Sequence, residues 1–292
     1  MDKQINILKN EPLSKYSFTR TGGPADFIAF PKSVDEVRSL VKQAKNDDLP
    51  ITVLGNASNL IIKDGGINGL VIMLTDMNSI SCDNHEIVAD AGASYIDVTI
   101  EAQRNSLSGL EFAAGIPGSV GGAIYMNAGA YGGETDKIVK SVVVLTNDAQ
   151  IKSLSNQELH FGYRHSLIQE NDYIVLQATF ELQSGDSNDI QLEMDHFNSL
   201  RASKQPLDLP SCGSVFKRPV GNFAGKLIHD SGLQGYQSGG AQVSTKHAGF
   251  IVNVDHANAT DYLDVIHHVQ AVVETNYNIH LETEVRIIGR DK

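Results

Sequence analysis

The chain has 292 residues, of which 41% are hydrophobic and 20% charged, values typical of a globular protein too long for one small core. Its formal net charge of −12 argues against a protein that follows the phosphates of nucleic acid. The two cysteines are too few for a disulfide framework, and the ten histidines lack metal-binding spacing, so we expect no metal site.

The N-terminal residues M-D-K-Q-I-N are polar, and they do not form the apolar core of a signal peptide. No run of about 18 apolar residues follows anywhere in the chain. We therefore expect a cytoplasmic protein that does not insert into a membrane, and nothing in the sequence indicates an obligate protein partner.

The first part of the chain reads as a small α/β unit. Residues Val34–Asn46 predict a helix that starts at Ser33, with apolar side chains on one face. A short apolar strand, Ile51–Leu54, then runs into the small-residue loop G-N-A-S-N, a typical place for a ligand. The apolar runs Leu60–Ile62 and Leu70–Leu74 flank K-D-G-G-I-N-G, which predicts a hairpin with a glycine turn.

The middle of the chain alternates strands and helices. We expect a helix over Tyr95–Asn105, with Ile96, Thr99 and Ile100 facing inward, and one over Asn188–Ser203, with Ile190, Met194, Phe197 and Leu200 on one stripe. Four segments predict strands, the second and third joined by a turn at Asn147-Asp148: Ile87–Ala93, Ile138–Thr146, Gln150–Leu154 and Tyr173–Leu182.

The proline-rich segment P-L-D-L-P after Gln205 predicts a domain boundary. Beyond it we expect helices over 224–231 and 260–277, the second capped by Asn258 or Thr260, and strands over 212–219, 248–254 and 281–288. We place the boundaries so that residues 1–80, 81–204 and 205–292 form three parts.

The run Ile116–Gly133 is rich in glycine and has no charged side chain. Glycines weaken regular structure, so the run suggests backbone that lies close against another group. Gly118, Ser119, Gly121 and Gly122 could turn consecutive N–H groups toward a diphosphate. A buried glycine-rich turn between packed segments is the alternative.

Three polar positions stand in apolar surroundings. Tyr163-Arg164 follows F-G at a turn, where an arginine could meet a carboxylate or a developing oxyanion, or form an ordinary salt bridge. Ser214 lacks a nucleophile-elbow motif, so it is either a proton donor or a turn residue. Glu282 and Glu284 alternate with apolar residues near the C-terminal end, which otherwise indicates a solvated face of a strand.

Taken together, these motifs resemble the UDP-N-acetylenolpyruvoylglucosamine reductase family, the flavoproteins of peptidoglycan precursor synthesis. The resemblance extends over nearly the whole chain, and the motifs occur in family order. They are T-R-T-G-G-P-A-D-F, L-G-N-A-S-N-L, G-L-E-F-A-A-G-I-P-G-S-V-G-G-A-I-Y-M-N-A-G-A-Y-G, F-G-Y-R-H-S, C-G-S-V-F-K-R-P, A-G-K-L-I and L-E-T-E-V-R. The chain is similar to the shorter type II subtype, because the segment between Arg164 and Ser214 is short.

The resemblance implies an α+β protein with an FAD-binding fold of the vanillyl-alcohol-oxidase (PCMH) type. Residues 1–80 and 81–204 would be its two FAD-binding subdomains, and 205–292 a C-terminal α+β substrate-binding domain whose final strand could return to the FAD region. FAD would be bound non-covalently, with NADPH as co-substrate. The residues implied for FAD are Gly55, Asn56, Ala57, Ser58, Asn59, Gly118, Ser119, Gly121, Gly122, Asn127, Ala128, Gly129, Arg201 and Arg286.

The resemblance also implies the roles of the three polar positions in reducing UDP-N-acetylglucosamine enolpyruvate. Arg164 and Glu284 would act at the substrate carboxylate and the enolate, with Glu284 in a protonated or proton-sharing form. Ser214 would be the proton donor to the adjacent carbon. The substrate-binding residues implied are Tyr163, Lys204, Lys217 and Arg218. Cys212 is expected to fill space and not to act as a nucleophile.

Two other functions stay open at the level of sequence. One is a flavin oxidase of the same fold that acts on another substrate, and many such oxidases attach the flavin covalently. The other is a non-catalytic protein that binds a nucleotide sugar, which would have no need for Arg164, Ser214 and Glu284 together.

Overall fold

The computed structural model describes residues 5–292 and divides the chain into two compact units. The first unit consists of the residues up to Leu8, Phe27–Asn56 and Gly69–Arg201. The second consists of Lys9–Asp26, Ala57–Asn68 and Ala202–Lys292. The predicted assignment of FAD and substrate roles to residues 1–80, 81–204 and 205–292 stays a prediction.

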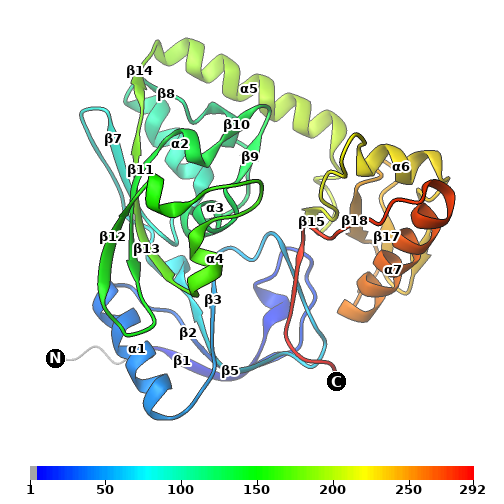
Figure 1. Cartoon of the computed structure of the whole chain (residues 1–292), viewed down its shortest axis with the longest axis horizontal. Helices are drawn as coiled ribbons and strands as arrows, with labels where there is room; N and C mark the ends of the chain where they lie inside the picture. Colours follow the sequence, from blue (N-terminus) through cyan, green and yellow to red (C-terminus); the bar gives the residue numbers. More distant parts are fainter. Residues whose placement is uncertain (1–4) are drawn as a thin grey trace. The chain divides into compact units, whose positions relative to one another are not determined.

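A five-stranded antiparallel sheet forms the centre of the first unit (Figure 1). Helices α2 (Tyr95–Arg104) and α3 (Val120–Met126) pack against it and share one buried apolar core with it. Leu145 pairs with Ile151 across the predicted turn at Asn147-Asp148, which confirms that hairpin. The strands, in sheet order, are β12 (Ile151–Ser155), β11 (Val139–Leu145), β13 (Ile174–Glu181), β7 (Glu86–Asp90) and β6 (Ile80–Asp83).

Helix α1 covers Val34–Asn46, as predicted, and its apolar face belongs to the same core. The side chain of Ser33 accepts a hydrogen bond from the N–H of Glu36, which caps the helix. In the other direction, Glu36 accepts from the N–H of Lys32. A four-stranded sheet has the order β1 (Ile7–Pro12), β2 (Pro24–Ala29), β5 (Ile67–Met73) and β3 (Ile51–Leu54).

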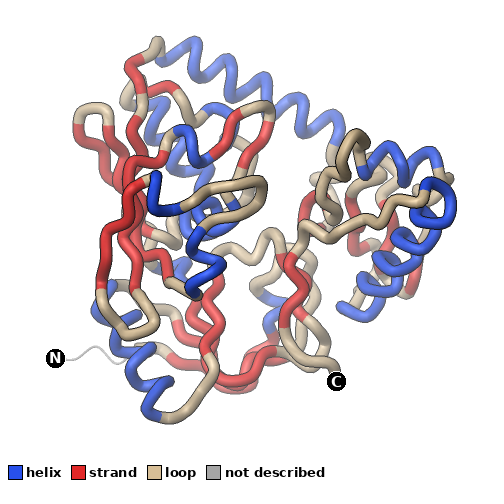
Figure 2. Tube along the Cα trace, viewed as in Figure 1, coloured by secondary structure: helices blue, strands red, loops and turns tan. Residues whose placement is uncertain are grey.

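The second unit has a core of its own, built on a four-stranded antiparallel sheet. Helix α7 (Ala259–Tyr277) packs against β17 and against α6 (Ala224–Asp230), and Figure 2 shows both helices beside the short strands. Asn258 caps α7 in a capping box with Asp261, which confirms one of the two predicted caps. In sheet order the strands are β15 (Ser211–Ser214), β18 (Phe250–Asn253), β17 (Ala241–Val243) and β16 (Gln237–Ser238).

The predicted hairpin between Leu60–Ile62 and Leu70–Leu74 is wrong. Strand β4 (Leu60–Ile62) pairs in parallel with β19 (Arg286–Ile288), whereas β5 pairs in parallel with β3. The glycines of the loop serve close approach and not a two-residue turn, because a Cβ at Gly65 would overlap the backbone of Asp291. A pairing partner so far along the chain leaves no local signal in the sequence.

Two predicted helix faces also differ from the structure. In α2 the buried stripe is Tyr95, Val98, Thr99 and Ala102, so Thr99 is buried as predicted, whereas Ile96 lies beside the stripe. Ile100 is half-buried and packs against the cluster of Ala114, Ile190 and Met194. The cause of this difference is Tyr95, whose ring packs against Phe112 and Phe180 and whose hydroxyl bonds to Thr135.

The long helix α5 (Ser187–Lys204) buries only the first half of its predicted stripe, at Ile190 and Met194. Phe197 instead stacks on Tyr131, with ring centroids 4.6 Å apart. The remaining elements are α4 (Leu167–Asn171), β8 (Leu107–Ser108), β9 (Gly129–Ala130), β10 (Gly133–Glu134) and β14 (Gln183–Ser184). Across residues 5–292, no helix is both long enough and apolar enough to span a membrane.

Candidate functional site

Two loops of small residues lie against each other in the first unit. The side-chain amide of Asn56 donates to the carbonyl oxygen of Pro117 at 3.4 Å. A Cβ added to Gly55 would overlap the hydroxyl of Ser119, so any larger residue there would have to displace the side chain that caps α3. The sequence therefore brings the start of the G-N-A-S-N loop to the start of α3.

The N–H groups at the start of α3 are arranged differently from the predicted anion-binding nest. Gly122 donates to the Ser119 hydroxyl, which caps the helix, and Gly121 donates to the carbonyl of Ala91 at 2.7 Å. These two donors are therefore already used within the protein. The physical reason is that α3 begins one residue after Ser119, so its cap takes up the donor of Gly122, while the carbonyl of Ala91, just after β7, takes up that of Gly121.

The charge of these two loops is compatible with the diphosphate of FAD. The residues Gly55, Asn56 and Pro117–Gly122 contain no carboxylate that would repel phosphate, although the N–H groups of Val120, Gly121 and Gly122 already donate within the protein. The first turn of α3 also has no acidic residue. The positive end of a helix and neutral hydrogen-bond donors favour a negatively charged group.

The rest of the first loop belongs to the second unit, where it meets the segment that carries Glu284. The side-chain amide of Asn59 donates to the carbonyl of Glu284 at 3.3 Å, and the N–H of Arg286 donates to the carbonyl of Asn59 at 3.1 Å. Ala57 is buried and adopts a left-handed conformation, with φ of 48°. FAD contacts of Ala57, Ser58 and Asn59 stay predictions.

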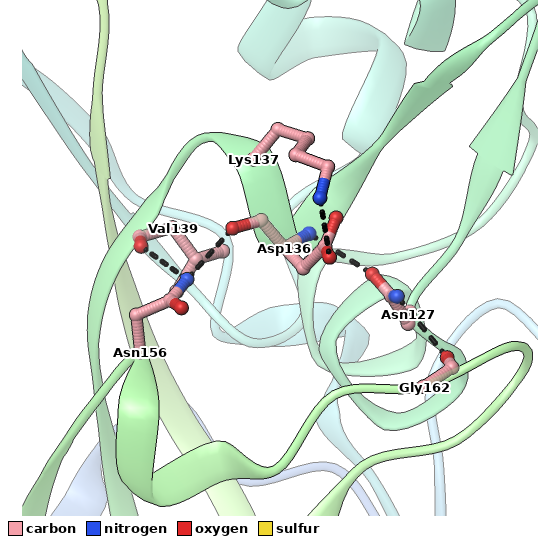
Figure 3. A network of polar contacts seen from close by, with 6 residues as sticks. All are labelled: Asn127, Asp136, Lys137, Val139, Asn156 and Gly162. Atoms are coloured by element: carbon pink, nitrogen blue, oxygen red, sulfur yellow. Dashed lines mark hydrogen bonds and ion pairs between the residues drawn. The ribbon is translucent and has the colours of Figure 1, made fainter.

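The C-terminal end of α3 is fixed by Asn127, which is 2% exposed and ends the helix in a left-handed conformation. Its amide nitrogen donates to the carbonyl of Gly162 at 3.1 Å, and its amide oxygen accepts from the N–H of Asp136 at 2.9 Å. Figure 3 shows this network, in which Asn156 also donates to the carbonyls of Asp136 and Val139. Contact of Asn127, Ala128 and Gly129 with the flavin stays a prediction.

Arg164 lies in a tight turn in the first unit. Gly162 and His165 exchange two backbone hydrogen bonds, of 3.1 and 3.2 Å, which close the turn. Arg164 itself has φ of 55°, and its guanidinium lies over the ring of Tyr163, 5.0 Å from the centroid. A nitrogen of the guanidinium donates to the carbonyl of Gly129 at 3.5 Å, so the side chain extends along the loop after α3.

Ser214 is exposed because of an irregularity in its strand. Ser211 pairs with Val252 and Ser214 with Phe250, so β15 contains one residue more than its partner between these pairs. The extra residue forms a bulge in which Gly213 adopts φ of 77°. In a regular strand Ser214 would face the same way as Cys212, which is buried. The bulge turns the serine outward, a role of Gly213 that the sequence signalled only by a glycine inside a strand.

Glu284 lies beside the Ser214 segment in the second unit. The N–H of Glu284 donates to the carbonyl of Val215 at 2.7 Å, and Phe216 pairs with Thr283. The two glutamates have different surroundings: Glu284 is half-buried, whereas Glu282 is exposed and forms an ion pair of 3.1 Å with Lys217. The predicted strand over 281–288 is shorter than expected, since only Arg286–Ile288 forms β19.

The structure thus pairs the segments that carry Ser214 and Glu284 in the second unit. In the first unit it brings Arg164 to the loop after α3, near the predicted cofactor residue Gly129. The catalytic roles of Arg164, Ser214 and Glu284 stay predictions.

Other predicted residues occupy varied surroundings. The Arg201 side chain packs against Gly115, where burial lowers the pKa of the guanidinium, and it bonds to Tyr131. The guanidinium of Arg218 lies 4.0 Å from the ring centroid of Phe223. Lys204, at the end of α5, and Arg286, in β19, are exposed. Their cofactor and substrate contacts stay predictions.

Cys212 is completely enclosed, and burial raises the pKa of its thiol to about 12. A thiol with so high a pKa is protonated at neutral pH and is a poor nucleophile. This agrees with the expectation that Cys212 fills space in the core.

Two comparisons with protein families match separate parts of the chain. Residues 25–155 match the FAD binding domain family. Residues 205–288 match the C-terminal domain of UDP-N-acetylenolpyruvoylglucosamine reductase.

Curated relatives match nearly the whole chain. The UDP-N-acetylenolpyruvoylglucosamine reductase of Pediococcus pentosaceus is 60% identical over 99% of this chain and 96% of its own length. The reductase of the same name from Limosilactobacillus fermentum is 62% identical over 98% of this chain and 96% of its own length.

Solved structures give the same result for the fold. The crystal structure of UDP-N-acetylenolpyruvylglucosamine reductase from Thermus caldophilus is similar with a TM-score of 0.84, at 31% identity, over 97% of this chain and 98% of that one. Cholesterol oxidase from Brevibacterium sterolicum shares the fold over 63% of this chain and 39% of its own, with a TM-score of 0.50 and 14% identity. The α+β fold of the vanillyl-alcohol-oxidase (PCMH) type is confirmed, and the chain belongs to the UDP-N-acetylenolpyruvoylglucosamine reductase family.

Proposed function

We propose that this protein uses NADPH, through non-covalent FAD, to reduce UDP-N-acetylglucosamine enolpyruvate to UDP-N-acetylmuramate for peptidoglycan synthesis in the cytoplasm. The observation that carries the proposal is the identity of 60% over 99% of the chain with a reductase of that name. The diphosphate-compatible loops of the first unit and the pairing of the Ser214 and Glu284 segments in the second support it.

FAD, when bound, would supply the redox chemistry, which is the transfer of hydride from NADPH to the terminal vinyl carbon of the enolpyruvyl group. The residues of the chain must then manage the negative charge that develops on the substrate. Arg164 offsets this charge at the carboxylate and the enolate oxygen, because a guanidinium keeps its charge and offers several donors.

Ser214 donates the proton that the adjacent carbon of the enolate requires. A serine hydroxyl is a weak acid, so this role depends on holding the hydroxyl at the right place, which the bulge at Gly213 provides. Glu284 assists in a protonated form, since an ionised carboxylate would repel the enolate.

Six positive or aromatic side chains remain for the nucleotide parts of the substrates and of the cofactor. Charged and bidentate donors suit phosphate oxygens, and aromatic rings can cover a sugar or base. We assign Tyr163, Lys204, Lys217 and Arg218 to substrate binding and Arg201 to the cofactor, with Arg286 as a further cofactor residue.

The proposed function is tested by following the flavin band of the purified protein, at about 450 nm, through the two half-reactions. NADPH should bleach the band without oxygen, and only the enolpyruvyl substrate should restore it under those conditions. A protein whose band ignores NADPH would be a binding protein without this activity. A band that oxygen restores as fast as the substrate does would indicate a flavin oxidase, and covalently bound FAD in a mass spectrum would point the same way.

A further inference from the structure

Side-chain amides hold the backbone of the Arg164 turn on both sides, one from Asn127 at the end of α3 and one from Gln169 in α4. Before Arg164, the carbonyl of Gly162 accepts from the Asn127 amide at 3.1 Å (Figure 3). After it, the carbonyl of Arg164 itself accepts from the side-chain amide of Gln169 at 3.0 Å. The same amide nitrogen of Gln169 donates to the carbonyl of Tyr125, in α3, at 2.7 Å.

Gln169 therefore bridges the turn and the helix. A backbone φ near 55°, as at Arg164, is uncommon for a residue other than glycine, and such a conformation persists only where its surroundings enforce it. The bond to the Arg164 carbonyl acts on the residue that has this conformation. The direction in which the arginine side chain leaves the backbone depends on keeping it.

We infer that Gln169 is a positioning residue for Arg164: it holds the arginine backbone so that the guanidinium points along the loop after α3. The inference rests on the proposed function, because it gives Gln169 a role only through the role of Arg164. Displacing a catalytic group by about 1 Å can cost up to about a hundredfold in rate. Replacing Gln169 can therefore lower the reaction rate even though Gln169 does not contact the substrate.

The amide of Gln169 can be removed without removing the whole attachment of the turn. Ser166, which is fully buried, also donates to the carbonyl of Tyr125, at 3.0 Å, and the Asn127 bond to Gly162 is independent of Gln169. Ile168 is buried and anchors α4 through its apolar side chain. We therefore expect Gln169→Leu, which keeps the volume of the side chain, to fold and to bind FAD.

The test measures both half-reactions of the FAD-loaded variant by rapid mixing. Gln169→Leu should leave flavin reduction by NADPH within about twofold of the parent and slow flavin reoxidation by the enolpyruvyl substrate about tenfold or more. Gln103→Leu is the matched control: Gln103 is also half-buried, and its amide nitrogen also donates to two acceptors, here the carbonyl and the hydroxyl of Ser187, elsewhere in the first unit. It should change neither half-reaction.

The same measurements on Arg164→Ala and on the double variant separate the inference from the proposed function. Arg164→Ala should slow the second half-reaction strongly, and adding Gln169→Leu to it should cause no further loss. If Arg164→Ala has no effect, the proposed role of Arg164 fails. If Arg164→Ala slows the reaction but Gln169→Leu does not, or if Gln169→Leu slows it equally without Arg164, the inference is overturned.

Should Gln169→Leu prove unstable, Gln169→Glu replaces it, since glutamate has the same shape but lacks the amide donor. The same outcomes then apply: slowing of the second half-reaction that depends on Arg164 supports the inference, and any other pattern contradicts it.

Discussion

The turn that carries Arg164 is attached to its surroundings by side-chain hydrogen bonds, whereas the strand that carries Ser214 is attached by backbone pairing. The carbonyls of Gly162 and Arg164 accept from the side chains of Asn127 and Gln169. The Ser214 strand is held by backbone pairing, with β18 on one side and with the Glu284 segment through Val215. Replacing the side chain of Gln169 should therefore displace Arg164, whereas the position of Ser214 should depend only on the backbone conformation of its strand.

Replacing the serine itself should give the largest effect. Ser214→Ala removes only the exposed hydroxyl and leaves the backbone pairing intact, so flavin reduction by NADPH should stay close to normal. The second half-reaction should slow by roughly two or more powers of ten, as expected for loss of a proton donor. Rapid mixing of each half-reaction checks this, and equal damage to both halves would contradict the role of Ser214.

Gly213→Ala breaks the backbone feature that places the serine. No atom outside the neighbouring residues lies within 4 Å of the added Cβ, so the cost comes from φ of 77°. We expect a loss of about 1 kcal/mol in the free energy of unfolding and about tenfold slowing of the second half-reaction as the bulge shifts.

Gly232→Ala is the matched control for that change, with φ of 69° and equally open space in the same unit. Urea unfolding should show a similar loss of stability, but the half-reactions should be unchanged. Identical kinetics in both variants would mean that the bulge does not set the position of Ser214.

Glu284→Gln tests a side chain on the segment that pairs with the Ser214 strand. The amide keeps the size of the side chain and offers a donor, as a protonated carboxyl would, so we expect the second half-reaction to fall by about tenfold or less. Turnover with the enolpyruvyl substrate at saturation is the measurement. Complete loss of turnover with intact substrate binding would instead require an ionised carboxylate or a proton relay.

Glu282→Gln should give the smallest effect. Its ion pair with Lys217 is exposed at both ends, with 42% and 69% of the side chains accessible, and exposed pairs contribute little to stability. The melting temperature should fall by no more than about 4 °C. A larger fall in a thermal melt would show that this ion pair, and not only backbone pairing, holds the Glu284 segment.

The local parts of the fold were predictable from the sequence. Helix α1 begins after Ser33 and α7 after Asn258 because cap residues and apolar spacing act over a few neighbouring positions. The β11–β12 hairpin followed from Asn147-Asp148 for the same reason. The predicted pairing of Leu60–Ile62 was wrong, because its partner is Arg286–Ile288, which lies too far along the chain for a local sequence pattern to indicate it.

The candidate site was predictable only in part, for a related reason. The motifs identified Arg164 and Ser214. The position of Arg164, however, depends on the side chain of Gln169, and that of Ser214 depends on a register shift in β15. Gln169 looked like any polar residue of a short helix, and its bonds to Tyr125 and Arg164 depend on a fold already formed. A glycine inside a predicted strand indicated a possible bulge at Gly213. The extra residue in β15, however, is defined only by the pairing of β15 with β18.

The parallel pairing of β4 with β19 has a consequence for the order in which the chain can fold. Arg290 bonds to Gly65, 225 residues earlier in the chain. Strand β4 is therefore synthesised long before its partner β19. At a translation rate of about 5 to 20 residues per second, that delay is roughly 10 to 45 seconds on the ribosome. During this time the edge of β4 is open to chaperones and to other nascent chains, and cutting the chain before Arg286 would leave it open permanently.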